Sequence, residues 1–217
     1  TNNDEGVAGV SWGARIMPLR TMVLDPTGTS FEGRVADQVE AVCYAANNGA
    51  RVILIGGYLF DPANVATDVE RLRQALEYAH TRGAVVVAPA GDCALPQGFC
   101  PPDQKYGTNP QIFPAAFRYV IGVQTYGSGI TARPEASYGS WVDITAPGEE
   151  FMTTYSEPPY KYVKHQPATS DFGAAHVAGV VAVLRSVNPD LSPYQEMDIP
   201  AVTTGTMIDR ELSARPP

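Results

Sequence analysis

One short stretch of the sequence holds residues that could do chemistry. Residues 168–184 read ATSDFGAAHVAGVVAVL, so Ser170 and Asp171 stand directly before an apolar run that predicts a buried helix. The carboxylate of Asp171 can accept first-turn N–H groups and is favoured by the helix dipole, which makes it a candidate N-cap. A serine hydroxyl can act as a nucleophile when a histidine takes its proton and a carboxylate holds that histidine.

The chain offers three histidines for that role. His176 belongs to the apolar helix itself, where a packing or capping role fits best. His80 lies near the end of a predicted surface helix, a favourable place for a cation. His165 lies in the loop that leads to the apolar helix, so it could approach a cleft there.

Alternating helix and strand patterns predict the scaffold that must position these residues. Helical spacing occurs over residues 35–47, 67–82 and 172–187, and β-type runs occur over 15–19, 52–55, 84–88, 119–123 and 141–144. This order implies right-handed crossovers and an α/β fold with a parallel sheet covered by helices on both faces. The active crevice of such a sheet lies beyond the carboxyl ends of the strands, after Ile55 and Ala88.

Several segments resemble one known family. HVAGVVAVLRSVNPDLSP (176–193), behind ATSDFGAA, resembles the serine-box helix of the subtilisin-like serine proteases (subtilases, peptidase S8). Four more segments are similar to the strand after that family's histidine box, to its oxyanion segment and to its later strands: GVAGVSWGARIMPLR (6–20), VVVAPAGD (85–92), FPAAFRYVIGV (113–123) and ASYGSWVDITAPG (136–148). The resemblance covers roughly residues 6–195 and implies a three-layer subtilisin-like fold and a serine endopeptidase.

The resemblance also shows where the chain departs from the family pattern. The family's aspartate and histidine boxes precede the segment that matches Gly6, whereas this sequence begins at Thr1, so we expect an N-terminally truncated, degenerate member. None of the three histidines matches the catalytic one. An upstream segment could supply both boxes.

Two alignments compete for the nucleophile. Counting back from His176 places Asp171 at the family's serine position, whereas counting forward from Ala168 makes Ser170 the serine and Asp171 an insertion. An insertion inside the helix would rotate its buried face by about 100°, so the preceding loop is the cheaper place to absorb it. We take that face to be anchored by Val177, Val180 and Leu184. The first alignment is therefore favoured, with Ser170 as the alternative nucleophile.

Asp92 stands where the family usually has an asparagine that donates to the oxyanion. An ionised carboxylate can only accept hydrogen bonds, and loss of such a donor typically costs about a hundred- to a thousandfold in rate. If Asp92 and Asp171 face each other, they should share a proton or bind a cation. The sequence thus predicts impaired catalysis, or a pseudoprotease that binds a peptide or protein without cleaving it.

The resemblance places peptide binding at two glycine-rich edges. Gly56 and Gly57 form one edge, and Ala88, Pro89, Ala90 and Gly91 form the other. An extended peptide could add there as a strand. These residues could equally serve only turns and close packing.

The bulk composition bounds the remaining possibilities. The 217 residues predict a single domain, with residues 203–217 as an irregular tail, and the net charge of −8 argues against nucleic acid. The sequence has no apolar run long enough for a membrane span. Cys93 and Cys100 could form a small disulfide in an extracellular setting or remain free thiols. Calcium is common among subtilases, but no acidic loop shows a ligand spacing for it.

Overall fold

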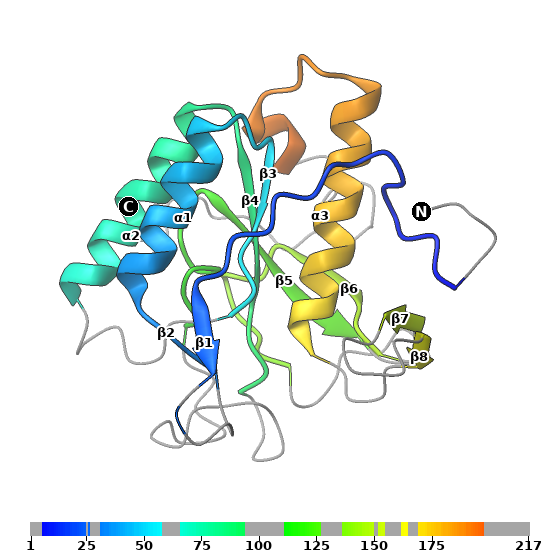
Figure 1. Ribbon diagram of the computed structural model, residues 1–217, viewed down its shortest axis with the longest axis horizontal. Coiled ribbons are helices and arrows are strands. Elements are labelled where there is room, and N and C mark those ends of the chain that lie inside the picture. The colour runs from blue at the N-terminus through cyan, green and yellow to red at the C-terminus, as the bar shows by residue number, and fades with distance from the viewer. Residues whose placement is uncertain are drawn as a thin grey trace.

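A four-stranded parallel sheet forms the centre of the molecule. The computed structural model describes residues 6–24, 26, 31–57, 66–93, 111–126, 136–149, 152–154, 162–164 and 169–197. The sheet has the order β3-β4-β5-β6, with β3 (Val52–Leu54), β4 (Val85–Pro89), β5 (Val120–Tyr126) and β6 (Ile144–Pro147) (Figure 1). The predicted α/β fold with a parallel sheet is confirmed.

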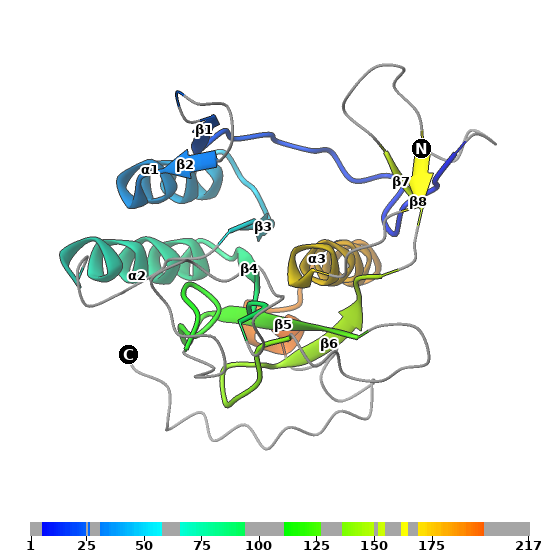
Figure 2. The ribbon, with the colours of Figure 1, turned by 90° about the horizontal axis from the view of Figure 1, so that it is seen from below.

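Helices cover both faces of this sheet. α1 (Val35–Asn47) and α2 (Ala66–Thr81) lie on one side, and α3 (Ser170–Val187) lies on the other (Figure 2). Successive side chains of a strand point to opposite faces of the sheet. Because helices cover both faces, β4 is apolar throughout. Val86 packs with α1 and α2, whereas Val85 and Val87 pack with α3.

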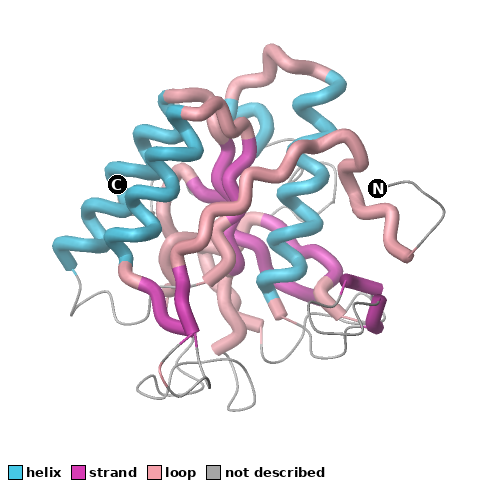
Figure 3. The backbone as a smooth tube through the Cα atoms, viewed as in Figure 1, coloured by secondary structure: helices cyan, strands magenta, loops and turns pink. Residues whose placement is uncertain are grey.

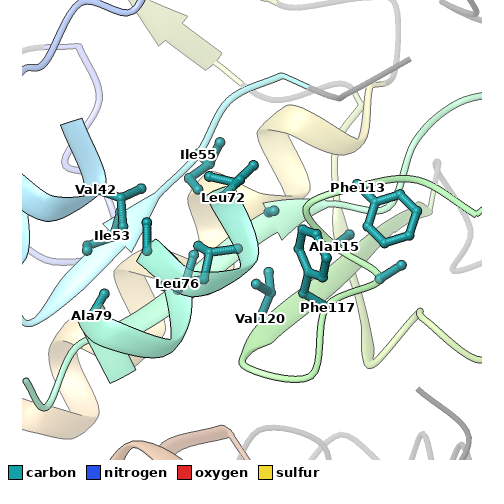
Figure 4. Close-up of a cluster of buried hydrophobic side chains, with 14 of the residues drawn as sticks. Val42, Ile53, Ile55, Leu72, Leu76, Ala79, Phe113, Ala115, Phe117 and Val120 are labelled. Atoms are coloured by element: carbon teal, nitrogen blue, oxygen red, sulfur yellow. The ribbon is translucent and has the colours of Figure 1, made fainter. Parts of the chain in front are cut away.

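The larger core lies between the sheet and the α1–α2 pair. Leu72 and Leu76 of α2 are fully buried there, together with the aromatic pair Phe113 and Phe117, whose ring centroids lie 4.7 Å apart (Figure 4). This packing covers one face of β4.

Two antiparallel hairpins lie outside the main sheet. β1 (Met22–Leu24) pairs with β2 (Phe31–Gly33), and β7 (Met152–Thr154) pairs with β8 (Tyr162–Lys164) (Figure 3). Neither hairpin hydrogen-bonds to β3 as a further strand.

Three element predictions were wrong in detail. Residues 15–19 form no strand, because no strand of the described residues pairs with them. The strand predicted over 141–144 begins only at Ile144. The helix predicted from Phe172 begins two residues earlier, at Ser170, and Val180 is 42% exposed and does not anchor its buried face.

Several other predictions concern residues outside the described part of the chain. His165, Cys100 and the tail 203–217 belong to this group. Among the helices of the described residues, none combines the length and apolar character needed to cross a membrane.

Candidate functional site

The segment that follows β4 is held by hydrogen bonds to its backbone groups. Residues 84–93 are all buried. The N–H of Ala90 donates to the Val123 carbonyl oxygen at 2.8 Å, and the indole N–H of Trp141 donates to the Ala90 carbonyl oxygen at 3.2 Å. The chain therefore continues along β5 beyond the end of β4, in the place where the sequence predicts an oxyanion segment.

The turn at Gly91 requires glycine. Its φ is +100°, and a Cβ built there would lie 2.6 Å from Cγ1 of Ile112 and 3.1 Å from Oγ of Ser137. The N–H of Ser137 donates to the Gly91 carbonyl oxygen at 2.8 Å, and the N–H of Cys93 donates to Oγ of Ser137 at 3.1 Å. The loop 136–138 thus closes over this turn.

Asp92 and Ser170 meet at the beginning of α3. The N–H of Ser170 donates to both carboxylate oxygens of Asp92, at 3.2 and 3.0 Å, and its hydroxyl donates to Oδ2 at 2.9 Å. The N–H of Gly91 donates in turn to Oγ of Ser170 at 3.3 Å. Ser170 is 0% exposed and Asp92 is 4% exposed, so the cluster is sealed from solvent.

The position of Ser170 on α3 explains its burial. Residues three, four, seven and eleven places apart share one face of a helix. Ser170 therefore lies on the buried stripe of α3, which continues through Gly173, Ala174, Val177 and Val181. Asp171 is rotated by about 100° from that stripe and is half-buried.

The prediction that Asp171 is the N-cap was wrong. The N-cap is Thr169, with the extended φ of −135°, and its side chain makes no capping hydrogen bond. The acceptor for a first-turn N–H is supplied instead by Asp92, which lies 78 residues before Ser170. Asp171 lies within the first turn, where the helix dipole still favours its negative charge.

His176 is tied to its own helix. Its Nδ1 lies 2.8 Å from the carbonyl oxygen of Phe172, one turn earlier. This contact agrees with the packing or capping role predicted for it.

His80 is half-buried at the end of α2, where burial opposes the positive charge that the helix end would favour. Its ring lies 4.7 Å from that of Tyr119 and 4.4 Å from that of Tyr194, and burial lowers the pKa of His80. Because α2 precedes β4 and Asp92 follows it, the five residues of β4, about 17 Å, separate His80 from Asp92.

The two predicted peptide-binding edges differ in access. Gly56 is exposed and Gly57 is half-buried, with a φ of +121°. Residues 88–91 are buried, and the pairing with β5 continues to Ala90. Peptide binding at this second edge stays a prediction.

The remaining predictions near the site concern a disulfide and a bound cation. Cys93 is disulfide-bonded, and Cys43 is a free thiol; the third cysteine, Cys100, lies outside the described residues. No group of three or more His, Cys, Asp or Glu that could hold a metal occurs in the described part of the chain. The carboxylate of Asp92 is engaged by Ser170, so nothing supports the cation predicted between Asp92 and Asp171.

Sequence comparison decides the family. The model of the subtilase family matches residues 1–212 of the chain. The chain belongs to the subtilase family. Two sequences similar to this subtilase are the thermophilic serine proteinase of Bacillus sp. (strain AK1), 32% identical over 186 residues, and thermitase of Thermoactinomyces vulgaris, 31% identical over 188 residues.

Solved structures agree with this assignment. A structure of proteases from Pseudoalteromonas arctica matches the subtilase chain with a TM-score of 0.69 and 25% identity, and it covers 91% of this chain and 58% of that one. The two sequence relatives each align with 86% of this chain, which spans 39% of the Bacillus protein and 57% of thermitase. This subtilase chain thus spans about half the length of those relatives.

Sequence reasoning missed the residues that close the site. Ser137 and Trp141 hold the turn after β4, and Thr125 donates from Oγ1 to the Thr169 carbonyl oxygen at 3.0 Å, which fixes the residue before α3. The similarity of residues 136–148 to a family loop indicated that this segment matters, but not which side chain reaches Gly91 or Cys93.

Proposed function

We propose that this chain is a subtilase domain, by family a serine endopeptidase, whose peptide-bond hydrolysis is impaired. The observation that carries the proposal is the state of Ser170, which is fully buried and donates its hydroxyl proton to Asp92. A nucleophile must reach the substrate carbonyl and pass its proton to a base, usually a histidine. A buried serine that points its proton at a structural carboxylate meets neither need.

The state of the hydrogen-bond donors supports the same proposal. Stabilising an oxyanion requires donors aimed at the place where negative charge develops. Here the N–H of Gly91 donates to Ser170, and the N–H of Ser170 donates to Asp92. The carboxylate of Asp92 contributes an acceptor where the family resemblance expects a donor, and its charge would repel an oxyanion.

A segment that supplied an aspartate and a histidine would not by itself restore this chemistry. Ser170 lies on the buried stripe of α3. A histidine supplied by another segment could therefore reach its hydroxyl only if the first turn of the helix opened. Asp171, at the favoured nucleophile position, carries a carboxylate and no hydroxyl.

Labelling with a fluorophosphonate tests the proposal, because this reagent forms a covalent adduct with activated serines. We expect no adduct by intact-mass spectrometry at reagent concentrations that label the Bacillus thermophilic serine proteinase completely. The Ser170→Ala variant is the matched control. An adduct that is present in the wild-type chain and absent from Ser170→Ala would contradict the proposal.

The alternative function is binding of a peptide or protein without cleavage. It is supported by Gly56 and Gly57, which remain accessible at the end of β3 while the reaction centre is closed. The disulfide at Cys93 supports an extracellular or otherwise oxidising location for either function.

A further inference from the structure

The turn between α1 and β3 holds a chemically reactive pair of residues. Asn48 is the only asparagine of the sequence that is followed by glycine. The backbone nitrogen of the residue after an asparagine can attack the carbon of the side-chain amide. Glycine leaves that nitrogen least hindered, because it has no Cβ.

This pair is accessible in the folded protein. Asn48 is the C-cap of α1, with a φ of −96° and a ψ of 16°, and Gly49 follows in the left-handed region with a φ of +79°. Both residues are exposed, and no atom of the described residues lies within 4 Å of a Cβ built on Gly49. The Asn48 side chain therefore has room to turn toward the backbone nitrogen of Gly49.

Two exposed hydrogen bonds hold the pair in its present conformation. Nδ2 of Asn48 donates to the Tyr44 carbonyl oxygen at 2.9 Å, and the N–H of Gly49 donates to the Ala46 carbonyl oxygen at 3.4 Å. The second bond is long for an N–H···O bond, so it stabilises the turn only weakly. The end of a helix frays at a small free-energy cost, and this opening frees both reacting groups without unfolding the packed core.

We propose that Asn48 is a site of spontaneous covalent modification, at which its side-chain amide becomes a carboxylate in the folded protein. The Gly49 nitrogen loses its proton to hydroxide and bonds to Cγ of Asn48, and the amide nitrogen leaves as ammonia, which gives a cyclic imide. Water then opens the imide at either carbonyl. One opening gives aspartate, and the other gives isoaspartate, in which the main chain runs through the side-chain carbon. The net reaction consumes water and releases ammonia, with no oxidation or reduction.

The modification changes the connection between α1 and the central sheet. The new carboxylate cannot donate to the Tyr44 carbonyl oxygen, and it places a negative charge at the negative end of the helix dipole. The longer main chain of the isoaspartate product also displaces the turn in which the N–H of Ala50 donates to the Ala45 carbonyl oxygen at 2.9 Å. β3 begins at Val52, so both products loosen the entry into the sheet. This holds whether or not the chain cleaves peptide bonds.

Peptide mapping by mass spectrometry tests the proposal on the folded full chain, incubated in mildly alkaline buffer. We expect the peptide that contains residues 47–49 to gain the mass difference between a carboxyl and an amide group, and to become a substrate for a protein isoaspartate methyltransferase. Asn47 is the matched internal control: it is also exposed but precedes Asn48, whose Cβ hinders the attack, so it should react at least about tenfold more slowly. Equal conversion of Asn47, or a folded chain that stays unmodified while the urea-unfolded chain reacts, would overturn the proposal.

Variants separate the reaction from its consequence. Asn48→Gln should abolish the mass gain in this peptide over the same time, because the attack would have to close a larger, less favourable ring, whereas Asn47→Gln should leave the gain at Asn48 unchanged. Asn48→Asp supplies the aspartate product directly, and its Ala50 amide should exchange hydrogen about two- to fivefold faster than that of the wild type, because of the charge at the helix end. Circular dichroism checks that the variants fold. A persistent mass gain in Asn48→Gln, or unchanged exchange in Asn48→Asp, would contradict the proposal.

Discussion

The carboxyl end of β4 and the outer edge of β3 belong to the same sheet but differ in whether their polar groups are engaged within the molecule. At the end of β4, Gly91, Asp92 and Ser170 bond to one another in a sealed cluster. At the outer edge of β3, Leu54 is exposed, and its N–H and C=O point away from β4. Family resemblance therefore indicates where a reaction centre lies in the fold. Burial and hydrogen bonding decide whether a ligand can reach that place.

A matched pair of glycine substitutions should give the largest effect in this comparison. Gly91→Ala should lower the free energy of unfolding by about 2–5 kcal/mol, because the new Cβ would meet Ile112 at 2.6 Å in a left-handed turn. Gly56→Ala, at the end of β3, should change it by no more than about 0.5 kcal/mol, since no atom of the described residues lies within 4 Å of the added carbon. Urea unfolding of both variants measures the difference. Equal losses of unfolding free energy in the two variants would mean that the chain is packed no more tightly around Gly91 than around Gly56.

A double-mutant cycle on Asp92 and Ser170 should give a smaller but more specific effect. Asp92→Ala should cost about 2–3 kcal/mol of unfolding free energy, because the buried N–H and hydroxyl of Ser170 lose their acceptor. Once Ser170 is alanine, the same change should cost less, with a coupling energy of about 1 kcal/mol. Additive losses in the double variant would argue against the cluster.

The sequence predicted the scaffold because local patterns determine it. The unbroken apolar run of β4 is typical of a strand buried on both faces, and the apolar run after Ser170 is typical of a buried helix. Residues 15–19 also have a strand-like pattern, but a strand requires a pairing partner, and none of the described residues supplies one. Local composition therefore could not predict that this segment stays unpaired.

The closure of the site could not be predicted in the same way. The start of α3 depends on a capping acceptor, Asp92, that lies 78 residues earlier in the chain. Without that contact, Asp171 was the nearest side chain able to cap the helix, so the helix was predicted to begin two residues late. The buried stripe that includes Ser170 follows only from the correct start of the helix.

Native-state hydrogen exchange of individual amides tests the central claim most directly, because it reports on the closed cluster and the outer edge of β3 in one experiment. The amides of Gly91 and Ser170 should exchange only through global or near-global unfolding, since both are buried and hydrogen-bonded. The amide of Leu54, directed away from β4, should exchange by local fluctuation, orders of magnitude faster. Exchange of the Gly91 and Ser170 amides as fast as that of Leu54 would contradict the account.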